Sequence, residues 1–345
     1  MFEANKELLR NIYKKTGNRR VAFCALPSIS YFGDLGDFTI SDKPVDLWIP
    51  QIAKNYESLM KFHAALQDDS VPYINISTGT HIYAAAFGAK IHLPPDERPC
   101  AVPFIESAAQ AQTITVPDIW KSPTIYRIFE MTDRIIRQFG NEVEIVCPDM
   151  QTGFDIMSIF WNKQDLLISM IDTPEIVKNT AAKCTMFLKQ FIREYKKQFP
   201  SWLPCHCPFV WSPPEMGPWF SNDECGCVTT QMFEEFMLPE LIELSHEFGG
   251  IGMHCCADAE HQFESFKKIP NWYGFNRVAA KQGFTPLIKH FSGQSGPVMV
   301  IGWMGDVEEI RELLSASPAA MKYIFQCNFE TLEDARMWLQ ACRSF

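Results

Sequence analysis

Three residues of this chain have the types and spacing of a metal site. His254 and Cys256 stand two positions apart in the segment GIGMHCCADAE, and Cys327 follows later in KYIFQCNFE. One imidazole and two thiolates are common ligands of Zn²⁺, and a set of three leaves the fourth coordination position open for a substrate atom. The pattern therefore predicts a catalytic zinc site rather than a closed structural one.

The same letters have a second interpretation, because the chain contains 8 His and 12 Cys among 345 residues and such pairs arise readily by chance. A core histidine and small buried thiols would look the same. Local context favours the metal. Residues i and i+2 of a strand project to one face, so His254 and Cys256 point together while Cys255 points away.

The elements that must position these residues are short apolar runs separated by amphipathic stretches. Strands that alternate with helices predict parallel β/α units, and eight of them predict a (β/α)₈ TIM barrel. A doubly wound open sheet is the alternative, although no Gly-x-Gly-x-x-Gly follows the first run. The eight runs are residues 20–28, 71–78, 141–149, 202–212, 249–258, 272–278, 297–305 and 322–329.

We expect one domain over residues 1–345, with a helical extension before the first strand and a long excursion over 79–123 between strands two and three. The longest helical patterns cover 46–66 and 173–199. Two shorter helices are predicted to begin at the N-caps Asp306 and Thr331, which have an acidic residue three positions later.

Barrel active sites lie at the carboxyl ends of the strands. His254, Cys256 and Cys327 fall at that end of the fifth and eighth runs, so the barrel would bring them together. Polar residues after the third and fourth runs are expected to face the substrate. We predict Asp149 and Asp223 as catalytic residues.

Further candidates lie near the same end of the predicted barrel. The predicted substrate-binding residues are Gln151, Tyr31 and His206. Cys205 and Cys207 share one face of the fourth run, where they form a second ligand group, a substrate wall or a pair of buried thiols. Cys225 and Cys227 lie in a predicted loop, where a structural role is favoured over a metal.

The bulk composition narrows the class of protein. A net charge of −10 argues against nucleic acid or an anionic membrane surface as the main partner. The charged N-terminal segment lacks the apolar stretch of a signal peptide, and no apolar run approaches a membrane span. The cysteines are therefore expected to be reduced thiols in a cytoplasmic protein.

Several segments are similar to a known superfamily. STGTHIYAAAFGAKI (77–91), PDMQTGFDIMSIFWNKQDLLISMIDTPEIVKNTAAKC (148–184) and NDECGCVTTQMFEEFMLPELIEL (222–244) resemble blocks of the uroporphyrinogen decarboxylase superfamily. Within it, the chain looks most like the zinc- and corrinoid-dependent methyltransferases, which carry His-x-Cys and a later Cys. The resemblance implies a (β/α)₈ barrel and Zn²⁺ on His254, Cys256 and Cys327.

The chain also departs from the sequence pattern of this superfamily. Ala257 replaces a Gly that usually follows the ligand Cys, and Cys255 is an additional thiol. The stretch 23–38 contains no Arg to grip porphyrinogen carboxylates, so decarboxylation of uroporphyrinogen is not expected.

The resemblance implies methyl transfer between a corrinoid (cobalamin) cofactor and a small substrate at zinc. That substrate is a thiol, such as the coenzyme M used by close relatives, or a methylated methoxy or methylthio compound. The corrinoid is expected on a separate protein, because Leu244 stands where a corrinoid-binding Asp-x-His-x-x-Gly motif needs Asp. A decarboxylase of a small acid or a porphyrinogen and a non-catalytic metal-binding protein are the alternatives. The sequence leaves open the substrate, the direction of transfer, the fourth zinc ligand and a homo-oligomeric state.

Overall fold

The computed structural model describes residues 2–28, 44–76, 78–94, 99–277, 283–293 and 296–344. Six parallel strands form its central sheet, in the order β1-β10-β9-β8-β7-β6. The first strand pairs with the last, which is the order of a barrel, whereas a doubly wound sheet reverses its order at a switch point. The strands are β1 (Val21–Pro27), β6 (Trp219–Ser221), β7 (Ile251–Cys255), β8 (Trp272–Arg277), β9 (Val298–Trp303) and β10 (Tyr323–Phe329).

Shorter pairings continue from β6 back toward β1. The strand β4 (Ile145–Val146) pairs in parallel with β5 (Trp202–Leu203), and Ile74 bridges to β4. Gln151 forms a bridge to β6, and the backbone N–H of Asp69 donates to β1. Across the described residues these links do not form one continuous ladder. The fold is therefore a mixed α/β, barrel-like arrangement in which no closed eight-stranded barrel is formed.

The sequence overestimated three of the strands. The predicted strand over 202–212 is wrong beyond β5, because Pro204 and Pro208 lack the N–H that a ladder requires. The chain leaves the sheet there and returns as β6. Among the described residues of the run 71–78 only Ile74 pairs, and the run 141–149 pairs as a ladder only in β4.

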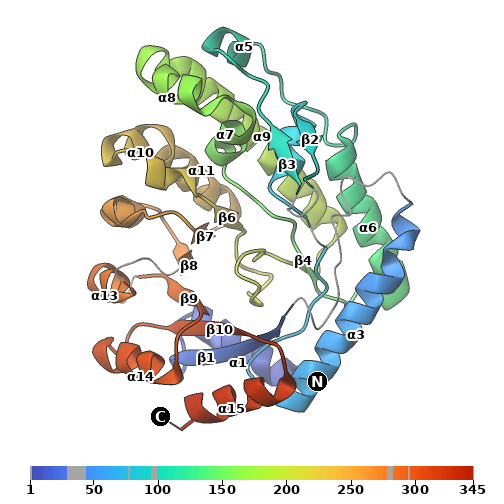
Figure 1. Ribbon diagram of the computed structural model, residues 1–345, viewed down its shortest axis with the longest axis vertical. Coiled ribbons are helices and arrows are strands. Elements are labelled where there is room, and N and C mark those ends of the chain that lie inside the picture. The colour runs from blue at the N-terminus through green and yellow to red at the C-terminus, as the bar shows by residue number, and fades with distance from the viewer. Residues whose placement is uncertain are drawn as a thin grey trace.

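Helices surround the strands as an outer layer (Figure 1). Both long helical predictions are confirmed to within a few residues at their ends. The N-caps are confirmed too, since Asp306 accepts from the backbone N–H of Glu309 at 2.9 Å and Thr331 from that of Asp334 at 3.1 Å. The larger helices are α3 (Ile49–Leu66), α6 (Pro123–Phe139), α7 (Gly153–Phe160), α8 (Lys163–Asp172), α9 (Pro174–Gln198), α10 (Thr230–Phe236), α11 (Leu238–Phe248), α13 (Thr285–Phe291), α14 (Val307–Ala316) and α15 (Leu332–Cys342).

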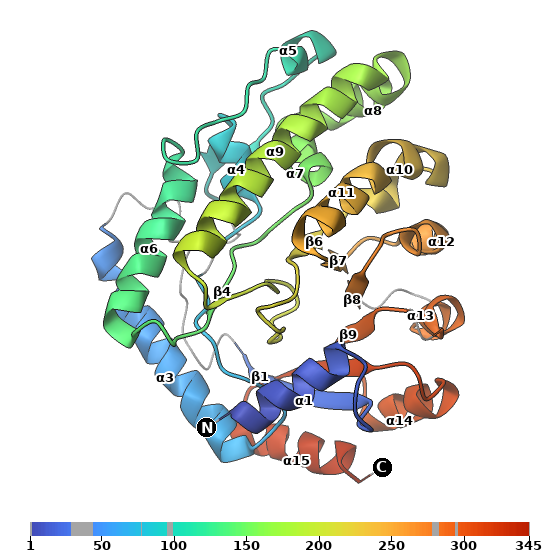
Figure 2. The ribbon, with the colours of Figure 1, turned by 180° about the vertical axis from the view of Figure 1, so that it is seen from behind.

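The N-terminal helix α1 (Glu3–Tyr13) lies beside β1, as Figure 2 shows. Its Leu9 and Ile12 share a buried cluster with Val298 and Ile324 from the inner face of the sheet. Because Lys6 pairs with Glu144, just before β4, α1 covers the amino-terminal ends of the strands. The carboxyl-terminal ends of the strands are not covered by α1 and can therefore form a functional site.

The excursion between the second and third runs carries a small unit of its own. It contains α4 (His81–Ala86), the antiparallel strands β2 (Lys90–His92) and β3 (Cys100–Val102), and α5 (Ala108–Gln112). In the described ranges, none of the helices has the length and apolar character needed to span a membrane.

Candidate metal centre

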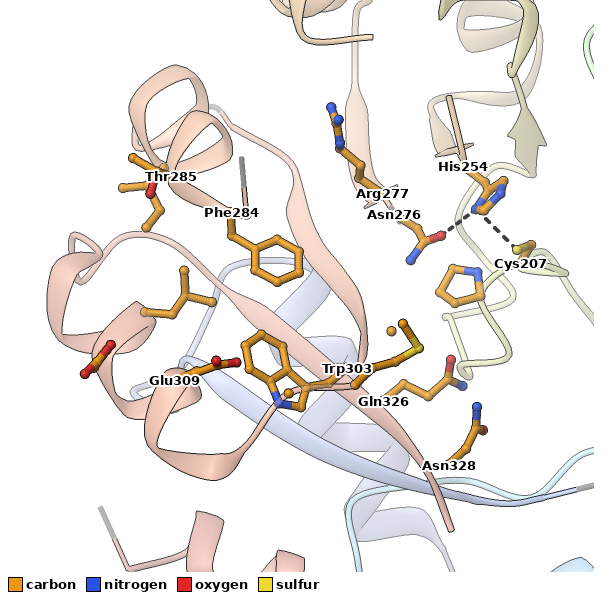
Figure 3. Close-up of a pocket in the computed structure, with 18 of the residues that line it drawn as sticks. Cys207, His254, Asn276, Arg277, Phe284, Thr285, Trp303, Glu309, Gln326 and Asn328 are labelled. Carbon is orange, nitrogen blue, oxygen red and sulfur yellow. Dashed lines mark hydrogen bonds between the residues drawn. The ribbon is translucent and has the colours of Figure 1, made fainter. Parts of the chain in front are cut away.

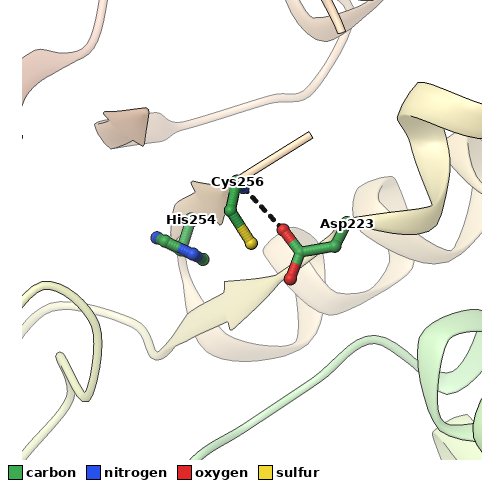
Figure 4. A group of neighbouring side chains, drawn as sticks. All are labelled: Asp223, His254 and Cys256. Atoms are coloured by element: carbon green, nitrogen blue, oxygen red, sulfur yellow. Dashed lines mark hydrogen bonds between the residues drawn. The ribbon is translucent and has the colours of Figure 1, made fainter. Parts of the chain in front are cut away.

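Three metal-binding side chains meet at the carboxyl ends of β6 and β7 (Figure 4). Asp223 follows β6, while His254 and Cys256 lie at the end of β7, and one ligand atom of each lies within 4.8 Å of the others. Imidazole nitrogen, thiolate sulfur and carboxylate oxygen are all ligands of Zn²⁺. The structure thus brings the predicted His254 and Cys256 together and adds Asp223.

Hydrogen bonds to a buried carboxylate hold the loop that carries Asp223. Asp155, at the start of α7, accepts from the backbone N–H of Asp223 at 2.6 Å and of Glu224 at 3.3 Å. Asp223 in turn accepts from the backbone N–H of Cys256 through Oδ1 at 2.7 Å. The second oxygen of Asp223 is left for a metal. Burial and the neighbouring Asp223 raise the pKa of Asp155 well above its usual value.

The imidazole of His254 is oriented by Asn276 on β8. The amide nitrogen of Asn276 donates to the carbonyl of Val300 at 2.7 Å, so its Oδ1 faces Nδ1 of His254, 2.5 Å away. Nδ1 must therefore carry the proton, which leaves the lone pair of Nε2 for a metal. Burial lowers the pKa of His254, which favours the neutral form that binds metal.

The two anionic donors match a divalent cation in charge. Partial burial and the adjacent Asp223 raise the pKa of the Cys256 thiol, so metal binding must displace its proton. One thiolate and one carboxylate then balance Zn²⁺. A further sulfur, that of Cys207, lies 3.3 Å from Nδ1 of His254. The donor set therefore fits zinc.

Cys327 is not part of this group. On β10, Ile324 belongs to the inner cluster of the sheet, whereas Phe325 and the half-buried Cys327 pack in the outer cluster beneath the helices. Cys327 lies close enough to Cys342 of α15 to raise the pKa of that thiol, after burial, to about 12. Within the described chain, no group of three metal-binding side chains includes Cys327. Its role as a ligand stays a prediction.

The predicted Asp149 and His206 lie beside the metal centre. Nε2 of the buried His206 is 3.3 Å from Oδ1 of Asp149 and 3.3 Å from Oγ of Ser221. Both Asp149 and His206 act electrostatically on the pKa of His254. Gln151 is buried next to β6 through its bridge to Ser221. The remaining candidate, Tyr31, lies outside the described residues.

The other clustered cysteines lie behind the site. Cys225 and Cys255 are buried, with their sulfur atoms 3.6 Å apart, and Cys227 is exposed. Sequence reasoning missed the positioning residues Asp155 and Asn276, since neither stands in a recognisable spacing with the donors. It assigned Asp223 a role in positioning the substrate rather than in binding the metal.

A cavity of 710 Å³ opens beside His254 (Figure 3). Its inner wall includes Cys207, Asn276, Gly302 and Gln326. Its outer part reaches α13 and α14, where the rings of Phe284 and Trp303 stack with centroids 5.5 Å apart. The cavity shares His254 with the group of Asp223, His254 and Cys256, so it can hold a small molecule beside that histidine.

Comparison with one solved structure supports the fold, and a second match is weaker. A methyltransferase from Methanosarcina mazei superposes with a TM-score of 0.65 at 13% identity, over 99% of this chain and 98% of that one. The oxidised form of the homocysteine methyltransferase MmuM from Escherichia coli gives a TM-score of 0.36 at 11% identity, over 99% of this chain and 84% of that one. No protein-family model matches the sequence, and neither does a curated protein.

Proposed function

We propose that this protein is a zinc-dependent methyltransferase, which moves a methyl group between a corrinoid and a small substrate activated at the metal. The observation that carries the proposal is the group of Asp223, His254 and Cys256, which adjoins a cavity at the carboxyl ends of the strands. The likeness to the Methanosarcina methyltransferase supports the barrel-like scaffold on which such a site is built.

The chemistry of the donors favours a substrate thiol or a methylated substrate over hydrolysis. Zinc bound by a thiolate and a carboxylate is a mild Lewis acid, which lowers the pKa of a bound thiol and keeps it nucleophilic. His254 binds through Nε2 and is held there by Asn276. Asp149 and His206 offer a proton acceptor beside the substrate, with their facing atoms 3.3 Å apart.

The corrinoid is proposed to arrive on a separate protein that docks over the open cavity. The sequence supports this, since the segment HEFG at 246–249 completes only half of a corrinoid-binding motif. The histidine of that segment lies in the last turn of α11, which ends at Phe248. The direction of transfer is set by the substrate, either toward a thiol or away from a methoxy or methylthio compound.

The test uses the zinc-loaded protein with methylcobalamin and small thiols, and with reduced cobalamin and methylated compounds, followed by the cobalamin spectrum. We expect methyl transfer in one direction and its loss in Cys256→Ser. Cys100→Ser, on the exposed strand β3, is the control and should retain activity. A protein with full zinc and no transfer in either direction would contradict the proposal and favour decarboxylation of a small acid.

A further inference from the structure

Acidic side chains predominate around the metal centre and its cavity. Asp149 and Asp223 lie beside His254, whose pKa both carboxylates influence. Glu309 and Glu312 line the part of the cavity next to α14. The donors already neutralise one divalent cation, so Asp149, whose Oδ1 faces Nε2 of His206, is an additional carboxylate beside the substrate. A negatively charged substrate would therefore be repelled.

The only cationic side chain among the described residues of the cavity wall is Arg277, and it is already engaged. Its Nη2 lies 3.0 Å from Asp258 and 3.6 Å from Glu260, and its guanidinium lies over the ring of Phe263. In Figure 3 the guanidinium points away from His254. Nη1 of Arg277 has no hydrogen-bond acceptor among the described residues. The negative charges of Asp258 and Glu260 nevertheless outweigh the single positive charge of Arg277.

Buried acceptors next to the metal centre lack donors. Oε1 of Gln151 and Oδ1 of Asn222 have no hydrogen-bond partner in the described part of the chain, and Oδ1 of Asp149 faces only Nε2 of His206, at 3.3 Å without hydrogen-bond geometry. Gln151 is 5% exposed and Asn222 is fully buried, so bulk water does not readily satisfy them. Unsatisfied buried acceptors are costly, and a ligand that brings N–H groups relieves the cost.

We infer that the substrate carries a protonated amine and that Asp149 is its counter-ion. This rests on the proposed function, since it places the amine next to a sulfur or methyl group at the metal. The substrate class is then amino-thiols, or methoxy and methylthio compounds of similar size that carry an amine. It excludes anionic thiols such as 2-mercaptoethanesulfonate, which the family resemblance alone would favour.

Three thiols share the same carbon chain and differ in the charge of the terminal group: 2-mercaptoethylamine, 2-mercaptoethanol and 2-mercaptoethanesulfonate. Each is titrated into the protein loaded with Co²⁺, and the thiolate-to-cobalt absorption band reports binding without methyl transfer. We expect the amine to bind about tenfold more tightly than the alcohol, and the sulfonate to bind most weakly. Asp149→Asn should remove most of the preference for the amine over the alcohol.

The matched control is Asp133→Asn, which removes a carboxylate that pairs with Arg137 on the exposed face of α6. It should leave the order of the three thiols unchanged. An amine can also chelate cobalt directly, but chelation would survive Asp149→Asn, so a preference unchanged in that variant overturns the inference. Sulfonate binding as tight as amine binding overturns it too and leaves the proposed function intact. If no thiol binds, the inference falls, and the proposed function is decided separately by the assay with reduced cobalamin and methylated compounds.

Discussion

Asn276 accepts a hydrogen bond from Nδ1 of His254 at 2.5 Å and thereby decides which imidazole nitrogen faces the metal centre. The bond that Asn276 donates to the carbonyl of Val300 prevents the amide from turning over. A histidine held in this way loses less freedom when it binds a metal, and it presents Nε2 without a competing tautomer. The metal centre thus depends on a residue that is not itself a ligand.

Asn276→Ala is expected to weaken zinc affinity by about 10- to 100-fold, because the imidazole loses its orienting acceptor. The measurement is competition with a chromogenic chelator. Asn328→Ala, at another position on the cavity wall, is the control and should keep the wild-type affinity. Equal affinities in the two variants would show that Asn276 does not orient the ligand.

Asp155→Ala is expected to loosen the Asp223 loop by removing the acceptor for two backbone N–H groups. We predict a loss of about 1–3 kcal/mol in the free energy of unfolding and a zinc affinity about tenfold lower. Asp165→Ala, on α8, removes the partly buried acceptor of the Trp161 indole N–H. It should lower the free energy of unfolding without changing zinc affinity. An equal drop in zinc affinity in both variants would contradict the role of Asp155 in holding the Asp223 loop.

Glu240 is expected to make stability depend on pH. It is buried on α11 and accepts from the backbone N–H groups of Gly153 and Phe154 and from Thr185. Burial raises its pKa from 4.5 to about 7. The folded chain therefore holds this proton more tightly than the unfolded chain does. The stabilisation is fully present below the unfolded pKa and is lost as the pH rises through about 7, by up to about 3 kcal/mol.

The measurement is urea unfolding of the wild type and Glu240→Gln at about pH 5 and about pH 8. The wild type should lose more stability than the variant between these two values. Glu243→Gln, on the same helix but paired with Lys189 at the surface, should follow the wild type. A Glu240→Gln protein with the full wild-type pH dependence would place the titration elsewhere.

Gly302→Leu is expected to block the cavity without harming the fold. A Cβ at Gly302, on β9, meets no described atom within 4 Å, and Gly302 lines the same cavity as His254. Thiol binding to the metal-loaded protein should weaken by about tenfold or more while zinc content stays unchanged. Unchanged thiol binding would show that substrates reach the metal by another route.

Substitution of a second glycine, Gly252, is expected to destabilise the fold instead. A Cβ at Gly252, on β7, would stand 2.2 Å from the ring of Trp219. Gly252→Ala should therefore lower the free energy of unfolding by roughly 1–3 kcal/mol through overpacking. Thermal unfolding of the two glycine variants separates a cavity position from a packed one.

The order of the strands could be predicted from the sequence because each apolar run is flanked by a helical pattern. The break after β5 could also have been read from Pro204 and Pro208, whose missing N–H groups interrupt a ladder. The sequence could not show which side chains of β10 face the inside of the sheet, because a shift of one residue exchanges the two faces of a strand. In the structure, Cys327 packs in the outer cluster beneath the helices, whereas its neighbour Gln326 lines the cavity.

The proposed donor role of Asp223 could not be predicted from sequence spacing. It follows from a loop whose conformation depends on Asp155, a residue from a distant part of the chain. Asn276 has the same character, since its effect requires the side-by-side register of β7 and β8, where it lies opposite His254. Contacts of this kind are made by tertiary structure and leave no local pattern.

The zinc content of three variants tests the metal centre most directly. Wild-type protein is expected to hold about one zinc per chain, and Cys256→Ser and Asp223→Asn should lose most of it. Cys327→Ser should keep it, because Cys327 packs on the outer face of β10. Loss of zinc in Cys327→Ser together with full retention in Asp223→Asn would contradict the Asp223, His254 and Cys256 centre and restore the ligand set that the sequence predicts.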